Sequence, residues 1–149
     1  MNILSLDPST KTGFAHSCGA SGTWDLNIRK DESKGMRLIR LRSKLQEIHR
    51  DIGIDLVVFE AARFAGMGGP LVVQSEIQGQ IKVFCEDQNP KIEYRGYSSK
   101  EIKAHAVNGK ATKAQMVALA RAKFGIEIID DNHADALWLL DLAQKEYSK

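Results

Sequence analysis

The 149-residue sequence lacks the marks of a membrane, secreted or metal-thiolate protein. Its two cysteines, Cys18 and Cys85, form no Cys-x-x-Cys or Cys/His ligand pattern, so we expect reduced, structural thiols. No stretch approaches the roughly 20 apolar residues that span a bilayer, and the first residues lack the basic and apolar regions of a signal peptide. Repeats and low-complexity segments are absent as well. We therefore expect one cytoplasmic domain over residues 1–149, with no membrane partner.

The sequence also has little net charge, because 21 Lys and Arg stand against 19 Asp and Glu. Residues 29–50 nevertheless carry eight Lys and Arg against three acidic residues, and residues 91–124 carry eight against two. Residues 127–149 reverse the balance, with two Lys against six acidic residues. The simpler interpretation is that solvated helices carry these cations. Basic segments around an acidic pocket also indicate a nucleic-acid partner, and both interpretations stay open at this point.

Short apolar runs and helical periodicity alternate along the chain. Strands are predicted at residues 2–6, 13–17, 22–28, 56–59 and 91–95, and a strand or extended segment at 126–129. Helices are predicted at residues 36–48, 70–88 and 131–147, and two more begin at the capping boxes Ser98-x-x-Glu101 and Thr112-x-x-Gln115, the second ending at Gly125. This order of elements predicts an α/β fold with a mixed sheet flanked by helices.

Three acidic residues occupy positions where a stable core would not place them. Asp7 and Glu60 each follow a short apolar strand, at the edge where open α/β sheets bind ligands. Asp135 lies in line with the apolar stripe of the last helix, so its side chain is expected to point toward the sheet. Asp131, one turn earlier, shares that face, and Asn132 lies one position aside.

Each of these residues also has an ordinary structural interpretation. Asp7 can be a turn residue, Glu60 a solvated residue at a strand end, and Asp131 the N-cap of the last helix. Asp135 is hardest to explain in this way, because a buried unpaired carboxylate is costly.

Carboxylates that converge repel one another and need a proton or a cation. A donor set of carboxylate oxygens without His or Cys suits Mg²⁺ or Mn²⁺ rather than Zn²⁺. Two such ions about 4 Å apart would activate water and stabilise the leaving oxygen in phosphodiester cleavage. The sequence therefore predicts a two-ion site built from acidic residues of different elements.

Four blocks of the sequence occur in an order that identifies a family. They are ILSLDPSTKTGFA (residues 3–15), DLVVFE (55–60), YSSKEIK with GKATKAQMV (97–117), and HADALW (133–138). In these blocks the chain resembles the RuvC-type Holliday-junction resolvases. The resemblance implies a ribonuclease H-like fold with a central mixed five-stranded sheet flanked by helices. It also implies a homodimeric, Mg²⁺-dependent endonuclease that resolves four-way DNA junctions and leaves 5′-phosphate and 3′-hydroxyl nicks.

The resemblance assigns the acidic residues to the catalytic metal site, with two ions per site. Asp7, Glu60 and Asp135 match the metal-binding carboxylates of the family. At the fourth position the family has Asp or His, whereas this chain has Asn132. We favour Asp131 as the fourth metal ligand, with Asn132 as a weaker one.

Basic and aromatic positions follow from the resemblance as well. Lys103 and Lys113 match lysines that lie near the scissile phosphate or the DNA backbone, and they are also expected to assist catalysis. Phe64, next to Arg63, matches a loop aromatic at the junction crossover that stacks on bases. The alternatives are that Phe64 is a core residue and that the lysines are merely solvated. The residues expected to contact DNA are Arg63, Phe64, Lys100, Lys103, Lys110 and Lys113.

Other functions stay open. The closest rival is a RuvC-like nuclease that acts on other branched nucleic acid or on RNA precursors. The turn after Asp7, which has Ser9 where the family usually has Gly, also resembles the phosphate loop of actin-like ATPases. Those proteins close two domains over a nucleotide and this chain has room for one, so we expect no nucleotide cofactor.

A nucleic-acid-binding module without activity would not explain carboxylates gathered at one strand edge. The four histidines form no pair with a Ser or Cys nucleophile. His133 is interpreted as a surface residue at the start of the last helix.

Overall fold

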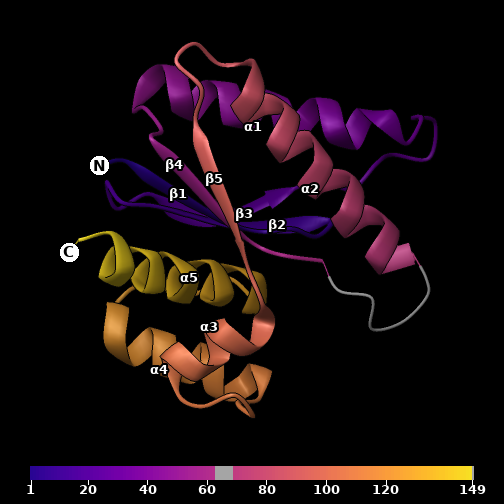
Figure 1. Ribbon diagram of the computed structural model, residues 1–149. Helices are drawn as coiled ribbons and strands as arrows, with labels where there is room; N and C mark the ends of the chain where they lie inside the picture. The colour runs from indigo at the N-terminus through magenta and orange to yellow at the C-terminus, as the bar shows by residue number, and fades with distance from the viewer. Residues whose placement is uncertain (63–68, 149) are drawn as a thin grey trace.

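The computed structural model describes residues 1–62 and 69–148 (Figure 1). Its sheet has the spatial order β3-β2-β1-β4-β5. The first three strands pair antiparallel, whereas β4 pairs parallel with both β1 and β5. The strands are β1 (Ile3–Asp7), β2 (Lys11–His16), β3 (Ser21–Asp25), β4 (Leu56–Glu60) and β5 (Glu93–Tyr97). The predicted mixed five-stranded sheet is confirmed.

Helices cover both faces of this sheet (Figure 1). The first face carries α1 (Gly35–Asp51) and α2 (Gly69–Asp87). The second carries α5 (Asp131–Tyr147), with α3 (Ser99–Ala106) and α4 (Lys113–Phe124) packed on its outer side. Because both faces of the sheet are covered, every residue of β1 is buried. A strand in this position has a largely apolar sequence rather than an alternating one.

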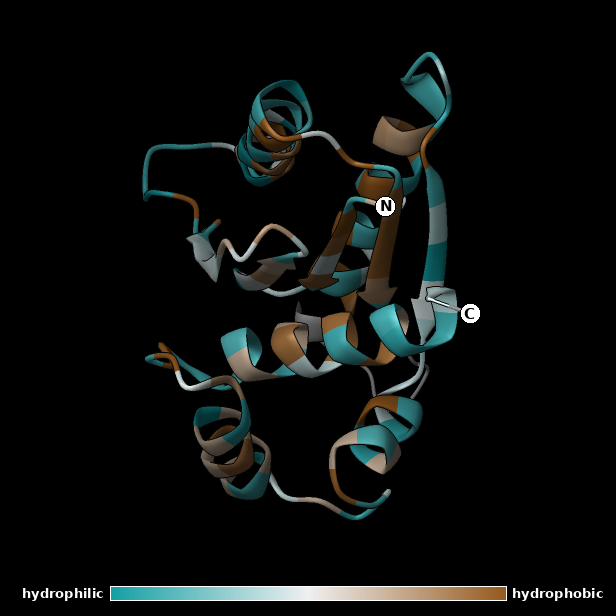
Figure 2. Cartoon of the chain, turned by 90° about the vertical axis from the view of Figure 1, so that its left-hand side faces the viewer, coloured by the Kyte–Doolittle hydropathy of each residue, from teal (hydrophilic) through white to brown (hydrophobic). Residues whose placement is uncertain are grey.

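The sheet therefore separates two hydrophobic cores. The one under α1 and α2 contains Leu41, Leu45 and Phe84, and the one under α5 contains Trp138 and Leu139. Figure 2 shows the hydrophobic colour concentrated on the central strands. Within the described ranges, no helix has the length and apolar character that crossing a bilayer requires.

The helix signals in the sequence are confirmed in detail at α3 and α4. Both capping boxes form, with Ser98 and Thr112 each accepting a hydrogen bond from the backbone amide three residues later. Gly125 ends α4 in the left-handed conformation, with a φ of 64°. At α5 the N-cap is Asp130, whose Oδ1 accepts from the His133 amide at 2.8 Å, so the alternative that Asp131 caps this helix is wrong.

The segment at residues 126–129 is not a strand. It connects α4 to α5 in irregular conformation and buries Ile128 in the core under α5. Its isoleucines favour a strand, but the burial of Ile128 in this core holds the segment without pairing it to a strand.

Helix α5 makes its closest approach to the sheet at a glycine. Gly13 of β2 is the register partner of Asp7, and a Cβ atom placed on it would lie 1.9 Å from the carbonyl oxygen of Asn132. On the adjacent strand, Ser5 donates a hydrogen bond to the Ala136 carbonyl at 2.8 Å. The first turns of α5 thus rest directly on the backbone of β1 and β2.

This contact predicts that Gly13→Ala destabilises the fold by about 1–3 kcal/mol, because the added methyl group overlaps helix backbone that cannot turn away. Urea unfolding followed by circular dichroism measures the change. Gly79→Ala is the matched control, since a Cβ there meets nothing within 4 Å, and it should leave stability equal or raise it by up to about 1 kcal/mol. Equal stability of Gly13→Ala and wild type would contradict the close packing.

Candidate metal centre

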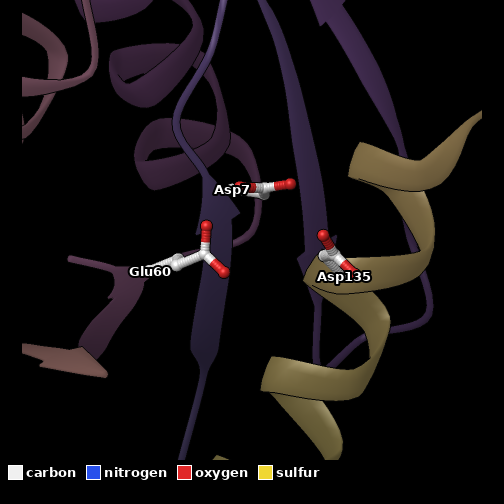
Figure 3. Close-up of side chains that lie close together, drawn as sticks. All are labelled: Asp7, Glu60 and Asp135. Carbon is white, nitrogen blue, oxygen red and sulfur yellow. The ribbon is translucent and has the colours of Figure 1, made fainter. Parts of the chain in front are cut away.

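Three carboxylates come together at the carboxyl edge of the central strands (Figure 3). Asp7 is the last residue of β1, Glu60 is the last residue of β4, and Asp135 projects from the second turn of α5. One carboxylate oxygen from each lies within 4.8 Å of the other two. The parallel register sets Leu6 beside Phe59, which brings the following residues, Asp7 and Glu60, side by side. The sequence predicts this convergence, while the role of the three as metal ligands stays a prediction.

Burial and mutual repulsion favour protonated carboxyl groups in this cluster. Asp7 is only 4% exposed, and burial raises its pKa well above the usual value, with further contributions from the charges of Glu60, Asp135 and Asp131. Burial also raises the pKa of Asp135 to about 7, again helped by Glu60 and Asp131, while the positive charge of Lys103 opposes the rise. Acidic groups held this close at neutral pH are stabilised by protons or by a bound cation.

The donor set fits a hard divalent cation. In the described part of the chain, the group of side chains close enough to share an ion consists of three carboxylates, with no His or Cys among them. Oxygen-only sets of this kind suit Mg²⁺ or Mn²⁺. Their origin in two strands and one helix gives the group a fixed geometry, since each carboxylate is attached to an element packed in the core.

Asp131 lies beside this group rather than within it. Its charge contributes to the raised pKa values of Asp7 and Asp135, and its Oδ2 lies 3.5 Å from the Nζ of Lys113. Asn132 turns its backbone carbonyl toward Gly13. The identity of a fourth ligand, Asp131 or Asn132, stays a prediction.

Two of the expected lysines lie near the acidic residues. Lys103, on α3, is close enough for its charge to lower the pKa of Asp135, and Lys113, at the start of α4, pairs with Asp131 while its side chain is 85% exposed. Lys100 and Lys110 are exposed on α3 and on the segment before α4. The predictions for Arg63 and Phe64 fall outside the described residues.

The turn after Asp7 is closed without glycine. The Ser9 amide donates to Thr12 Oγ1 at 3.3 Å, and the same hydroxyl donates to the Ser9 carbonyl at 2.7 Å. None of the described non-glycine residues has a positive φ. Serine therefore forms this turn without backbone strain, directly after Asp7 at the end of β1.

The interpretation of His133 as a surface residue is wrong. This side chain is 2% exposed, its Nδ1 accepts from the Ile129 amide at 3.1 Å, and its Nε2 hydrogen-bonds with Ser21 Oγ at 2.9 Å. Burial lowers its pKa, which favours the neutral ring. The helical spacing from His133 to the buried Leu137 and Leu140 is the sequence signal that places it on the sheet-facing side. Its partners make it a structural tie between α5 and β3.

Comparison with known proteins identifies the fold. No protein-family model and no curated protein matches the sequence. Among solved structures, Thermus thermophilus RuvC matches with a TM-score of 0.72 and 20% identity, over 99% of this chain and 95% of that one. T. thermophilus RuvC in complex with a Holliday junction substrate matches with a TM-score of 0.73 and 17% identity, over 93% and 90%.

The yeast mitochondrial Holliday junction resolvase Ydc2 also matches, with a TM-score of 0.63 and 13% identity, over 97% of this chain and 80% of that one. Structural similarity at sequence identities of 13% to 20% shows a shared fold. The chain has the fold of RuvC, which confirms the predicted ribonuclease H-like class with its helix-flanked sheet.

The raised pKa of Asp135 predicts a pH-dependent stability in EDTA. The pKa of about 7 exceeds the usual 3.8, so the folded chain binds more protons than the unfolded chain between these values. The free energy of unfolding therefore falls as pH rises through this window, by up to about 1.4 kcal/mol per unit. Asp135→Asn removes this loss. In urea unfolding, the free energy of unfolding of the variant should therefore rise relative to that of wild type between pH 5 and pH 8.

Asp51→Asn provides the control for that measurement. Asp51 is an exposed carboxylate on α1 whose pKa is lowered by the Arg50 hydrogen bond, so it stays ionised at both pH values. Its stability difference from wild type should not change with pH. The same constant difference for Asp135→Asn would contradict the electrostatic account of the cluster.

Proposed function

We propose that this chain is a divalent-metal-dependent endonuclease that cleaves four-way DNA junctions. The observation that carries the proposal is the convergence of Asp7, Glu60 and Asp135, from three different elements, within 4.8 Å. A structure with the same fold, T. thermophilus RuvC, has a Holliday junction substrate bound, and the match covers 90% of that chain. The site, the fold and the basic residues beside the site all suit a polyanionic substrate.

Asp7, Glu60 and Asp135 would hold the metal, with Asp131 or Asn132 as the fourth ligand. We propose two Mg²⁺ ions per site, replaceable by Mn²⁺. When bound, such ions supply a nucleophilic water at neutral pH and stabilise the leaving oxygen of a phosphodiester. The chain's own contribution is to fix the carboxylates on packed elements, so that no side chain has to be ordered during the reaction.

The lysines would act on the phosphate. Lys103 and Lys113, which face the carboxylates, stabilise negative charge that develops on the phosphate, and the products are nicks with 5′-phosphate and 3′-hydroxyl ends. Lys100 and Lys110 are exposed and hold the DNA backbone, a contact that positions the strand without reading its sequence. Arg63 and Phe64 are proposed to engage the bases and phosphates at the crossover.

A homodimer completes the proposal, because two opposed strands of a junction need two sites. Helix α2 supports this, since Val72 and Val83 are 57% and 50% exposed. They lie eleven residues apart, which puts them on one side of the helix. Between them this side carries the exposed Ser75, Glu76 and Gly79, so the two valines would be the apolar contacts of a mixed interface with a second copy.

The proposal predicts cleavage of a four-way junction in Mg²⁺ and none in EDTA, with matched linear and flap substrates cleaved far more slowly. Asp7→Asn should lower the rate by at least about 100-fold, because the cluster loses its most buried charge. Asp51→Asn, an exposed carboxylate on α1, should keep the wild-type rate. Denaturing gels of end-labelled substrates measure all of these rates.

Other results would redirect the assignment. Equal cleavage of linear duplex contradicts junction selectivity, and cleavage confined to flaps or RNA favours a nuclease for other branched nucleic acid or RNA precursors. Tight junction binding without cleavage in any divalent metal favours a binding module.

A separate comparison decides the fourth ligand. If Asp131 binds metal, Asp131→Asn should slow cleavage by about 10-fold or more, whereas Asn132→Ala should change it little. Raising the Mn²⁺ concentration should partly restore the first variant, because the lost ligand weakens metal binding. Full activity of Asp131→Asn would rule out Asp131 and leave Asn132.

A further inference from the structure

Helices α3 and α4 form an outer layer that packs on α5 (Figure 1). This layer carries Lys103 and Lys113, the lysines that face the acidic cluster. Their positions relative to the carboxylates therefore depend on how α3 and α4 are seated on α5. Asp141, whose contacts contribute to this seating, lies on α5 six residues after Asp135.

One carboxylate on α5 holds both outer helices. Asp141 Oδ2 lies 2.7 Å from His105 Nε2 of α3 and 2.9 Å from Lys123 Nζ of α4. Partial burial favours the neutral acid, but the hydrogen bonds from Lys123 and His105 outweigh it, so the pKa of Asp141 is lowered. Charge-assisted hydrogen bonds of this kind are short and about twice as strong as neutral ones.

The contact restrains α3 where packing alone is weak. This helix has eight residues, and Ile102 is its buried side chain. Ala106 is partly buried beside it, so the apolar contact of α3 with the core is small. His105 adds a second anchor, and Lys103 lies two residues before it on the same helix.

The contact also fixes the far end of α4. Lys113 pairs with Asp131 near the start of each helix, and Lys123 pairs with Asp141 ten residues later on each. Between these ion pairs, Trp138 Nε1 donates to the Met116 carbonyl at 2.9 Å. The far end of α4 also packs Phe124 against Trp138, with ring centroids 5.1 Å apart, and the Asp141–Lys123 pair adds a directional contact to this packing.

We propose that Asp141 is a positioning residue for the nuclease reaction, seating α3 and α4 so that Lys103 and Lys113 face the carboxylate cluster. The inference rests on the proposed function for its effect on cleavage. Asp141 does not touch the substrate, and it acts through the two lysines.

The test pairs a structural readout with a kinetic one. Zero-length carbodiimide cross-linking joins an amine to a carboxylate in contact, so wild type should give a Lys113–Asp131 amide that peptide mass spectrometry quantifies. Asp141→Asn should lower its yield by at least about threefold, and Asp141→Glu should restore it. Glu146→Gln is the matched control, since this carboxylate lies on the same helix but bonds Arg95 and Tyr97 of β5, and the yield should stay at the wild-type level.

In junction cleavage, Asp141→Asn should lower kcat by about 10-fold with KM changed by less than about twofold. In a Lys103→Met/Lys113→Met background, Asp141→Asn should cause no further slowing, because both lysines through which it acts are already absent. An undiminished cross-link in Asp141→Asn, at a temperature where circular dichroism shows the variant folded, overturns the proposal. Further slowing by Asp141→Asn in the Lys103→Met/Lys113→Met background overturns it as well. Absence of cleavage by wild type overturns the nuclease function instead, while the cross-link still decides the positioning.

Discussion

The direct packing of α5 on the backbone of β1 and β2 is the contact on which the site depends. Gly13 leaves no side chain between the strand and the helix, and the Ser5 hydroxyl ties the Ala136 carbonyl to the sheet. Because Gly13 is the register partner of Asp7, the helix comes closest where the first carboxylate lies. Asp135, on the next turn, then reaches Asp7 and Glu60. A wider separation would leave two acidic residues at a strand edge and a third out of reach.

This packing brings like charges together, and their repulsion is an electrostatic cost that the protein keeps at this one site. Burial and repulsion raise the pKa values of Asp7 and Asp135, so the cluster opposes folding when it is ionised. Charges elsewhere are arranged to stabilise the fold, as in the pairing of Asp141 with Lys123 and His105. An acidic cluster held against its own repulsion by a packed core is typical of a site for cations. On α5, Asp135 belongs to the repelling cluster and Asp141 to the stabilising ion pairs. This contrast distinguishes the candidate site from the contacts that support it.

Local sequence signals predicted much of this arrangement because they act over a few residues. The apolar strands ending at Asp7 and Glu60, the capping boxes of α3 and α4, and the helical spacing of Asp135 all depend on near neighbours in sequence. The two basic segments also proved to lie apart, since α1 covers one face of the sheet while α3 and α4 lie beyond the other. Features that depend on distant partners were missed, among them the buried ties of His133 to Ser21 and of Asp141 to two other helices.

The central claim is that the three converging carboxylates bind divalent metal. Anomalous X-ray diffraction from crystals of the protein grown with Mn²⁺ tests it most directly. The account predicts anomalous peaks at coordination distance, roughly 2.0–2.3 Å, from carboxylate oxygens of Asp7, Glu60 and Asp135. Density for all three side chains with no anomalous peak among them, at a Mn²⁺ concentration of several millimolar and pH 8, would contradict the account.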